Sequence, residues 1–360
     1  MTELRSKHEE LNAKFTSRAN SSYPLHYGRP LRTVQAIRNG VGLIEMPYDI
    51  LRIHGDDRIE YVDNIISNTV PHEDGEGCYA FLLDPEGKIR IDMYVYSTSD
   101  QLLLFCPPGT ADEIAEEWND KTFLQDVTVA DKSNEFAIFG VHGPQATEKL
   151  ASVLNQAAAP EESLTFNRGK ISDNGVTVIR NDGLVGEEGY EIVCQHSHTA
   201  TVFDTLLNHG LNAVPFGLET WNILTLEAGT PLYETELRDR IPLLVGTRNA
   251  LDLEKGCFVG QEVVSRIENR GQIRERLIGL ELESSVSESA TVMIDGNDVG
   301  NITRVKESPT CNSPIAFALC KMTEINGEIT VSEDNISTSA KQRTFPFVTG
   351  SDTSARIPRY

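Results

Sequence analysis

Eight consecutive residues carry the most reactive group in the chain. Residues 255–262 read K-G-C-F-V-G-Q-E and place the thiol of Cys257 between two glycines, after Lys255 and before an amide and a carboxylate. The spacing of apolar residues after Gly260 predicts a short helix there. A thiol beside a cation at a helix start gains thiolate character, which suits redox chemistry, capture of a one-carbon unit or transient contact with a cluster. The alternative is an inert cysteine in the core.

Two further carboxylates follow a glycine turn. Residues 186–191 read G-E-E-G-Y-E, so Glu187, Tyr190 and Glu191 lie where a predicted strand begins. A carboxylate accepts hydrogen bonds only, and it can take two N–H donors at once. The pattern therefore suits a ring that offers N–H donors, and the alternative is a solvated acidic turn in an acidic protein.

A third carboxylate, Asp92, lies within a predicted strand. Because side chains alternate along a strand, Ile89, Ile91 and Met93 share one face and Asp92 lies on the other with Arg90. We expect the apolar face to pack on a core and Asp92 to face solvent or a central cavity, where it would suit proton transfer. The alternative is an exposed carboxylate paired with Arg90.

The elements that position these groups follow a repeated pattern. Residues 53–55 (I-H-G) and 141–143 (V-H-G) each end a predicted strand at a glycine turn that precedes a predicted helix. The repeat predicts two related α+β lobes. From about residue 277 the chain changes to short strands and turns, which predicts a small all-β domain. The polar tail after Gly350 is expected to be loosely held.

Length and charge limit the class of protein. A chain of 360 residues fits two or three domains, and no apolar run reaches the roughly 18 residues that a membrane span needs. Acids outnumber bases 54 to 32, which gives a net charge of −22 and makes non-specific nucleic-acid binding improbable. An acidic surface poor in lysine is typical of a halophilic host, where salt screens self-repulsion; the alternative is an ordinary acidic cytosolic protein.

The six cysteines are scattered along the chain. No C-x-x-C pair and no zinc-finger spacing occurs, which predicts buried thiols in a reducing compartment and no permanent metal site. The first 22 residues are polar and lack the apolar stretch of a secretory signal. We therefore expect a cytoplasmic protein without a membrane segment.

Residues 255–262 resemble the K-G-C-x-x-G-Q-E signature of the YgfZ-type folate-binding proteins, which are relatives of the glycine-cleavage T-protein, an aminomethyltransferase. The resemblance extends from about residue 40 to 349. Its other pieces include H-G at 54–55, G-C-Y-A at 77–80, G-K-I at 87–89, G-P at 143–144, G-E-E-G-Y-E at 186–191, L-E-A-G at 226–229, R-G at 270–271 and F-P-F at 345–347.

The resemblance implies an α+β fold with two ferredoxin-like lobes, one inserted in the other, and a C-terminal β-barrel, all arranged around a central folate site. On this basis residues 1–275 form the folate-binding region, with the inserted lobe at about 50–132, and residues 276–360 form the barrel. Tetrahydrofolate is the implied cofactor.

The resemblance also implies roles for single residues. Glu187 corresponds to the glutamate that holds the pterin, and Asp92 and Cys257 are the candidate catalytic residues. The remaining candidates for cofactor binding are Glu191, Tyr190, Trp221, Lys255 and Arg270.

The chain departs from the T-protein pattern at three positions. The first residue of an Asp-Asp pair is Ile91 here, and an arginine that precedes L-E-A-G is Trp221, which either stacks on the cofactor or belongs to the core. The T-protein segment usually lacks the cysteine that this chain has at Cys257. These departures move the expectation away from a standard aminomethyltransferase.

Residues 255–276 hold five bases and three acids in an otherwise acidic chain. We expect this segment to receive the glutamate tail of folate or an anionic partner, unless its charges form surface pairs such as Glu262 with Arg266.

Three functions stay open from the sequence. The resemblance favours a tetrahydrofolate-binding protein that supports assembly or maintenance of iron–sulfur enzymes, with iron–sulfur client proteins as partners. The alternative is a folate-dependent aminomethyl or methyl transferase that works with a lipoyl carrier protein or as a demethylase. The third is a scaffold that has lost folate, so whether the protein is an enzyme is undecided.

Overall fold

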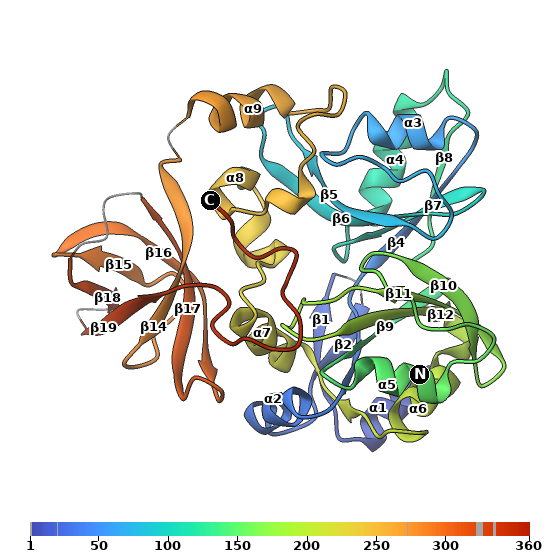
Figure 1. Cartoon of the computed structure of the whole chain (residues 1–360), viewed down its shortest axis with the longest axis horizontal. Coiled ribbons are helices and arrows are strands. Elements are labelled where there is room, and N and C mark those ends of the chain that lie inside the picture. Colours follow the sequence, from blue (N-terminus) through green and yellow to red (C-terminus); the bar gives the residue numbers. More distant parts are fainter. Residues whose placement is uncertain (1, 20, 272, 322–326, 334–335) are drawn as a thin grey trace.

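The computed structural model describes residues 2–19, 21–271, 273–321, 327–333 and 336–360, which form two packed sheets, a small two-stranded sheet near the N-terminus and a separate barrel (Figure 1). Among the described residues no helix is long and apolar enough to cross a membrane. The expected α+β fold class with a C-terminal barrel is confirmed by these sheets.

The first sheet has six strands in the order β10-β11-β12-β9-β3-β13. Helices α1, α5 and α6 cover one face, where Leu4, Leu150 and Phe203 pack against Val141 and Ile192. The sheet pairs are antiparallel except β13 with β3. Its strands are β3 (Gly42–Glu45), β9 (Phe136–His142), β10 (Phe166–Ile171), β11 (Asn174–Arg180), β12 (Gly189–Gln195) and β13 (Val214–Pro215). The helices are α1 (Glu3–Glu10), α5 (Ala146–Val153) and α6 (Thr199–Asn208).

The second sheet has five antiparallel strands in the order β5-β6-β7-β4-β8, and all of them lie between β3 and β9 in the sequence. Two helices cover one face, and the other face packs on the first sheet through Phe81, Tyr94, Tyr96 and Phe105. The elements are β4 (Asp49–His54), α3 (Arg58–Asp63), β5 (Gly77–Leu83), β6 (Ile89–Ser97), β7 (Gln101–Cys106), α4 (Ala111–Lys121) and β8 (Thr128–Asp131).

The alternation predicted for β6 is largely confirmed. Ile91 and Met93 pack under the helices, and Tyr94 packs between the sheets. Ile89 was expected beside Ile91, but it packs in the layer between the sheets. The reason is a bulge: Leu82 pairs with Ile91 and Leu83 with Ile89, so the intervening residue of β6 is skipped.

The barrel closes in the order β14-β17-β16-β15-β18-β19 around its own apolar core. Its strands are β14 (Glu275–Leu282), β15 (Thr291–Ile294), β16 (Asn297–Ser308), β17 (Ser313–Lys321), β18 (Ile329–Glu333) and β19 (Ile336–Arg343). The remaining elements are β1 (Lys14–Arg18), β2 (Ser21–His26), α2 (Pro30–Arg38), α7 (Leu218–Glu227), a π-helical turn (Tyr233–Leu237), α8 (Pro242–Val245) and α9 (Gln261–Arg270). Two 3₁₀ turns span His196–His198 and Arg248–Ala250.

The tail after Gly350 is not loosely held, which corrects the expectation from its polarity. It leaves the barrel, passes α7 and ends beside α8, coloured dark red in Figure 1. Ser354, Arg356 and Ile357 are buried. The Tyr360 hydroxyl accepts a hydrogen bond from the backbone of Leu277 at 2.7 Å. Polar residues therefore anchor this segment through hydrogen bonds instead of apolar burial alone.

Candidate functional site

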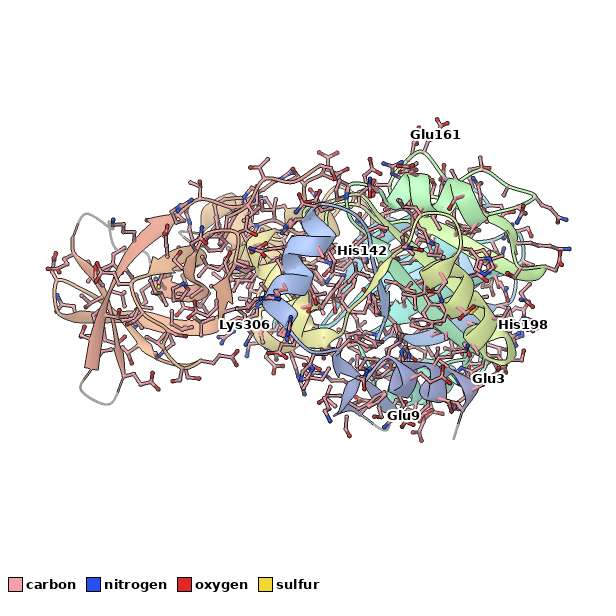
Figure 2. All side chains as sticks on the ribbon, turned by 90° about the horizontal axis from the view of Figure 1, so that it is seen from below. Glu3, Glu9, His142, Glu161, His198 and Lys306 are labelled. Atoms are coloured by element: carbon pink, nitrogen blue, oxygen red, sulfur yellow. The ribbon has the colours of Figure 1, made fainter. Side chains whose placement is uncertain are left out.

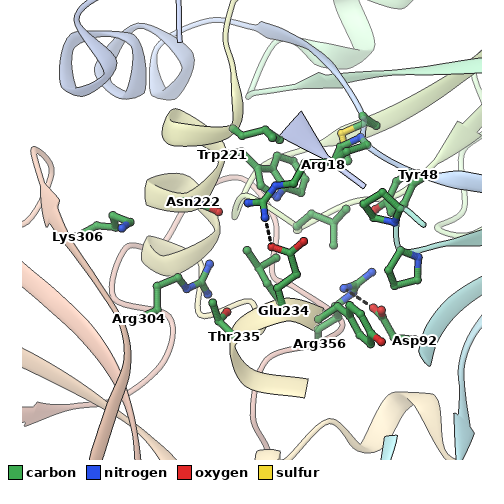
Figure 3. A pocket seen from close by; sticks show the side chains of 18 of the residues that line it. Arg18, Tyr48, Asp92, Trp221, Asn222, Glu234, Thr235, Arg304, Lys306 and Arg356 are labelled. Atoms are coloured by element: carbon green, nitrogen blue, oxygen red, sulfur yellow. Dashed lines mark hydrogen bonds and ion pairs between the residues drawn. The ribbon is translucent and has the colours of Figure 1, made fainter. Parts of the chain in front are cut away.

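The two sheets, the barrel and the tail meet around a cavity of about 330 Å³ (Figure 3). Its wall combines apolar and aromatic side chains with a few charged groups, as ligand sites generally do. The lining residues used below are Arg18, Tyr48, Asp92, Trp221, Asn222, Glu234, Arg304, Lys306 and Arg356.

Asp92 lies on β6, in the cavity wall, and is 5% exposed. Its Oδ2 accepts hydrogen bonds from the Tyr79 hydroxyl at 2.9 Å and from Nη1 of Arg356 at 3.0 Å. No described residue donates to Oδ1. The carboxylate is thus held through one oxygen while the other stays available. The alternative of an exposed Asp92 paired with Arg90 is wrong, because Arg90 pairs with Glu117 at 2.7 Å.

Arg356 comes from the tail, and no sequence motif indicates it. Its guanidinium carbon lies 4.2 Å from the ring centre of Tyr79 and 4.9 Å from that of Tyr94. Its Nε donates to the Tyr94 hydroxyl at 3.1 Å. A buried cation is stable only with such partners, and Asp92 supplies the matching charge. Figure 3 shows this ion pair at one end of the cavity.

Glu191 lies on β12 and shares the side of Val193, which packs between the two sheets. It is fully buried, and neither carboxylate oxygen has a hydrogen bond of full geometry among the described residues, although the side chains of Asn181 and Tyr48 lie close enough to lower its pKa. Burial raises the pKa of Glu191 to about 7, against the opposing influence of Asn181, Arg356 and Tyr48. Tyr48 and Arg356 line the cavity, so Glu191 lies just behind that part of its wall.

An unpaired buried carboxylate costs free energy, and proteins usually satisfy such a group with water or a ligand. The side-chain nitrogen of Asn181 and the hydroxyl of Tyr96 are also buried without partners among the described residues. Of these groups only the Glu191 carboxylate is limited to accepting hydrogen bonds, so a group with N–H donors would match it.

Glu187 is buried but does not line the cavity, and the alternative of a solvated acidic turn is wrong. Its Oε1 accepts from Nη1 of Arg38 at 2.9 Å, and its Oε2 accepts from the backbone of Ser351 at 2.8 Å. Arg38 also bonds Glu227 at 2.8 Å. Glu187 therefore ties the tail to α2 and α7, and its role toward a pterin stays a prediction.

Trp221 lines the cavity, whereas Tyr190 does not. The Tyr190 side chain packs on the helix-covered face of the first sheet, where its hydroxyl lies 2.9 Å from Oγ1 of Thr147. Trp221, on α7, lines the cavity and packs in the core, and its stacking on the cofactor stays a prediction. Its ring lies 5.4 Å from that of His142, and burial lowers the pKa of His142 to about 3.

Of the three candidates from the segment at 255–276, Lys255 and Cys257 do not line the cavity. Lys255 donates to the backbone oxygens of Asp63 and Asn68 at 2.5 and 2.8 Å, so it anchors the end of α3. Cys257 is exposed, so the expectation of a core cysteine is wrong. Arg270 ends α9, and its side chain lies outside the described part of the structure.

The expectation that this segment receives a glutamate tail gains no geometric support. Arg266 pairs with Glu262 at 2.6 Å, as the alternative anticipated, and Glu268 pairs with Arg248 at 2.8 Å. Instead, the cavity contains cations from other parts of the chain: Arg18, which pairs with Glu234, and the buried Arg304. Sequence reasoning missed both, because no local motif surrounds them.

Buried thiols were expected for all six cysteines, and four of them are buried: Cys78, Cys106, Cys194 and Cys320. Within the described residues no group of three or more His, Cys, Asp or Glu side chains could hold a metal ion.

Comparison with known proteins identifies the architecture. A family model described as the GCVT N-terminal domain matches residues 4–255. A second, described as the glycine cleavage T-protein C-terminal barrel domain, matches residues 275–348. The crystal structure of the glycine cleavage system aminomethyltransferase T from Bartonella henselae superposes with a TM-score of 0.86 at 20% identity, over 98% of this chain and 99% of that chain. That likeness shows the fold.

Two relatives are similar in sequence over nearly their whole length. The aminomethyltransferase of Corynebacterium aurimucosum is 30% identical over 330 residues, 88% of each chain. The aminomethyltransferase of Thermosipho melanesiensis is 30% identical over 359 residues, 97% of each chain.

Proposed function

The chain belongs to the glycine cleavage T-protein family, and from this we propose that it binds tetrahydrofolate in the central cavity and transfers a one-carbon unit. Tetrahydrofolate is the cofactor of this family. The similarity to aminomethyltransferases favours the transferase over the iron–sulfur accessory role that the sequence first suggested.

The observation that carries the proposal is the unpaired carboxylate of Glu191 behind the cavity wall. A pterin ring presents adjacent N–H donors, and one carboxylate can accept two of them. A ligand of this kind would satisfy a buried group that no described residue satisfies. We therefore assign the acceptor of the pterin to Glu191, which lies behind the wall at Tyr48 and Arg356, and an aromatic wall to Trp221, which lines the cavity.

The chain's own contribution to chemistry centres on Asp92. When bound, tetrahydrofolate supplies the nitrogens that accept the one-carbon unit. The Oδ1 atom of Asp92, in the cavity wall and without a donor among the described residues, can hold or accept a proton there. Arg356 and Tyr79 fix the carboxylate through Oδ2. Asp92 thus acts as a single carboxylate, because this chain has Ile91 where the T-protein pattern has the first aspartate of an Asp-Asp pair.

A test of the proposal is anaerobic titration calorimetry with tetrahydrofolate. We expect Glu191→Ala to weaken binding by about 1–3 kcal/mol, because pterin donors would lose their acceptor. Glu188→Ala is the matched control, since Glu188 bonds Thr147 outside the cavity. Glu187→Ala in the same series tests the role implied for that residue. Equal affinity of the wild type and Glu191→Ala would remove the assignment of Glu191 and the basis of the proposal.

A second candidate function is the accessory role of YgfZ-type proteins toward iron–sulfur enzymes. The observation that favours it is the exposed thiol of Cys257, presented at the surface on a loop that Lys255 anchors. Single-turnover mixing with a lipoyl-bound aminomethyl donor separates the two. Methylene-tetrahydrofolate formation supports the transferase, whereas tight binding without transfer supports the accessory role.

A further inference from the structure

A second cavity, of about 520 Å³, lies between the two packed sheets. None of its described lining residues lines the central cavity. Its wall comes from β4, β6 and β7 of the second sheet and from β9 to β12 of the first sheet. Figure 2 shows Lys306, which lines the central cavity, close to the barrel, and His198, three residues after Gln195 of the second cavity, on the side of the molecule away from the barrel.

Arg52 lies on the face of β4 that packs toward the first sheet. Side chains alternate along a strand, and Leu51 and Ile53 pack under the helices of the second sheet, whereas Ile50 packs between the sheets. Arg52 therefore shares the face of Ile50, and it lines the second cavity. A cation in such an apolar layer costs free energy unless a charge or a hydrogen bond compensates it.

The described residues do not supply this compensation. Arg52 forms no ion pair and no side-chain hydrogen bond with them, and its Nε is buried without a partner. Arg168, the other base in the wall, is already satisfied, because it donates to both carboxylate oxygens of Asp74 at 2.8 and 3.1 Å. Asp74, and more weakly Asp100 of the wall, raise the pKa of Arg168. Arg52 is thus the uncompensated charge of the described wall.

Aromatic rings form much of the remaining surface. The ring centre of Tyr96 lies 5.1 Å from that of Phe105 and 6.2 Å from that of Phe166, and Phe136 also lines the cavity. The Tyr96 hydroxyl is buried and has no hydrogen-bond partner within the described ranges. The cavity therefore combines a broad apolar surface with a few polar groups, as sites for small molecules generally do.

These features select an anion with an apolar body. A guanidinium presents a planar fork of donors that matches a carboxylate, and this charge-assisted pair is stronger than a neutral hydrogen bond. One uncompensated cation balances one negative charge, whereas a phosphate group brings nearly two.

We propose that the second cavity binds an aryl-substituted monocarboxylate, with the carboxylate on Arg52 and the ring among Tyr96, Phe105 and Phe166. Binding satisfies the guanidinium and covers aromatic surface in one step. The inference does not rest on the proposed function, because the two cavities share no described lining residue.

The test uses para-bromophenylacetate as the probe and para-bromophenylethanol as its neutral counterpart. Titration calorimetry on the full chain should give a Kd about tenfold lower for the acid than for the alcohol, because only the acid forms a charged pair with Arg52. Arg52→Met should lose most of this ratio. Arg18→Gln is the matched control and should keep the ratio, since Arg18 is a cation of the central cavity.

A crystal of the wild type soaked with the acid locates the probe without any variant. The anomalous signal of bromine should lie beside Tyr96 and Phe166. The inference is wrong if neither compound binds, if both bind equally, if Arg52→Met keeps the full ratio, or if the bromine lies in the central cavity. A ratio that falls in Arg18→Gln instead would also overturn it. If Arg52→Met does not fold, the wild-type ratio and the bromine position decide.

Discussion

The pairing of Asp92 with Arg356 joins residues 264 positions apart in the chain. Both side chains are 7% exposed, so each charge depends on the other for compensation. The rings of Tyr79 and Tyr94 and the Tyr94 hydroxyl complete the surroundings of the guanidinium, while the Tyr79 hydroxyl donates to Asp92. Charge balance at this point of the cavity is therefore a property of the pair.

We expect Arg356→Gln to lower the free energy of unfolding by about 3–5 kcal/mol, because it leaves a buried carboxylate without its cation. Adding Asp92→Asn should recover part of this loss, since the uncompensated charge is then removed. Arg359→Gln, three residues further along the tail and exposed, is the control. Chemical denaturation of the wild type, Arg356→Gln, Asp92→Asn and the double variant measures the coupling, with the control alongside. Strictly additive losses would show that the two residues do not act as a pair.

Glu191 predicts a dependence of stability on pH. Its pKa is raised from 4.5 to about 7 in the folded protein, so the folded state holds a proton that the unfolded state has released. Its favourable contribution is therefore complete below about pH 4.5 and is lost as the pH rises through 7. The loss amounts to about 3 kcal/mol for a shift of this size.

Glu191→Gln should remove that slope, because an amide does not titrate between these pH values. Urea unfolding of both proteins at pH 5 and pH 8 measures the difference. A variant that loses as much stability over this interval as the wild type would show that another group is responsible.

At the level of elements, Lys255 explains part of the K-G-C segment in structural terms. The Lys255 side chain is 4% exposed. Its ammonium group lies 3.1 Å from Oδ1 of Asp63 and beside two backbone oxygens at the end of α3. The segment thereby fixes the inserted sheet to the connection before α9.

We expect Lys255→Met to reduce stability by about 1–3 kcal/mol, because backbone oxygens at the end of α3 lose their donor. Lys121→Met serves as the control, since Lys121 is 63% exposed and its surface pair contributes little. Thermal or urea unfolding measures both. Equal effects of the two substitutions would contradict the anchoring role.

Local sequence patterns predicted the strands well, whereas features that depend on contacts between distant segments could not be predicted from them. The alternation in β6 and the change to short strands near residue 277 were readable because strand periodicity depends on neighbouring residues. The bulge that moves Ile89, the anchoring of the tail and the role of Arg356 depend on contacts between distant segments. The same holds for Glu187: its motif was recognisable, but its partners Arg38 and Ser351 were not. The proposed boundary at residues 275 and 276 stays a prediction.

At the scale of the whole molecule, the excess of 54 acids over 32 bases bears on stability. Self-repulsion of this charge weakens the compact state, and salt screens it, with a Debye length of about 8 Å at physiological ionic strength and about 3 Å at 1 M. The proposed halophilic origin thus has a physical consequence that can be measured.

We expect the thermal unfolding midpoint to rise by several degrees between about 0.2 and 2 M potassium chloride, because repulsion is relieved. Differential scanning fluorimetry measures it, with a non-ionic osmolyte at matched osmolarity as the control. A midpoint that is insensitive to potassium chloride, or that rises equally with the osmolyte, would favour the alternative of an ordinary acidic protein.

The exposure of Cys257 has a practical consequence. All six cysteines lie among the described residues, and it alone is exposed, with Cys311 intermediate and the other four buried. A maleimide dye should therefore label the native protein first at this position. The label would report from the junction of the inserted sheet and α9 without occupying the cavity. Single-molecule fluorescence could then follow whether the lobes move as a ligand enters, with no engineered cysteine required.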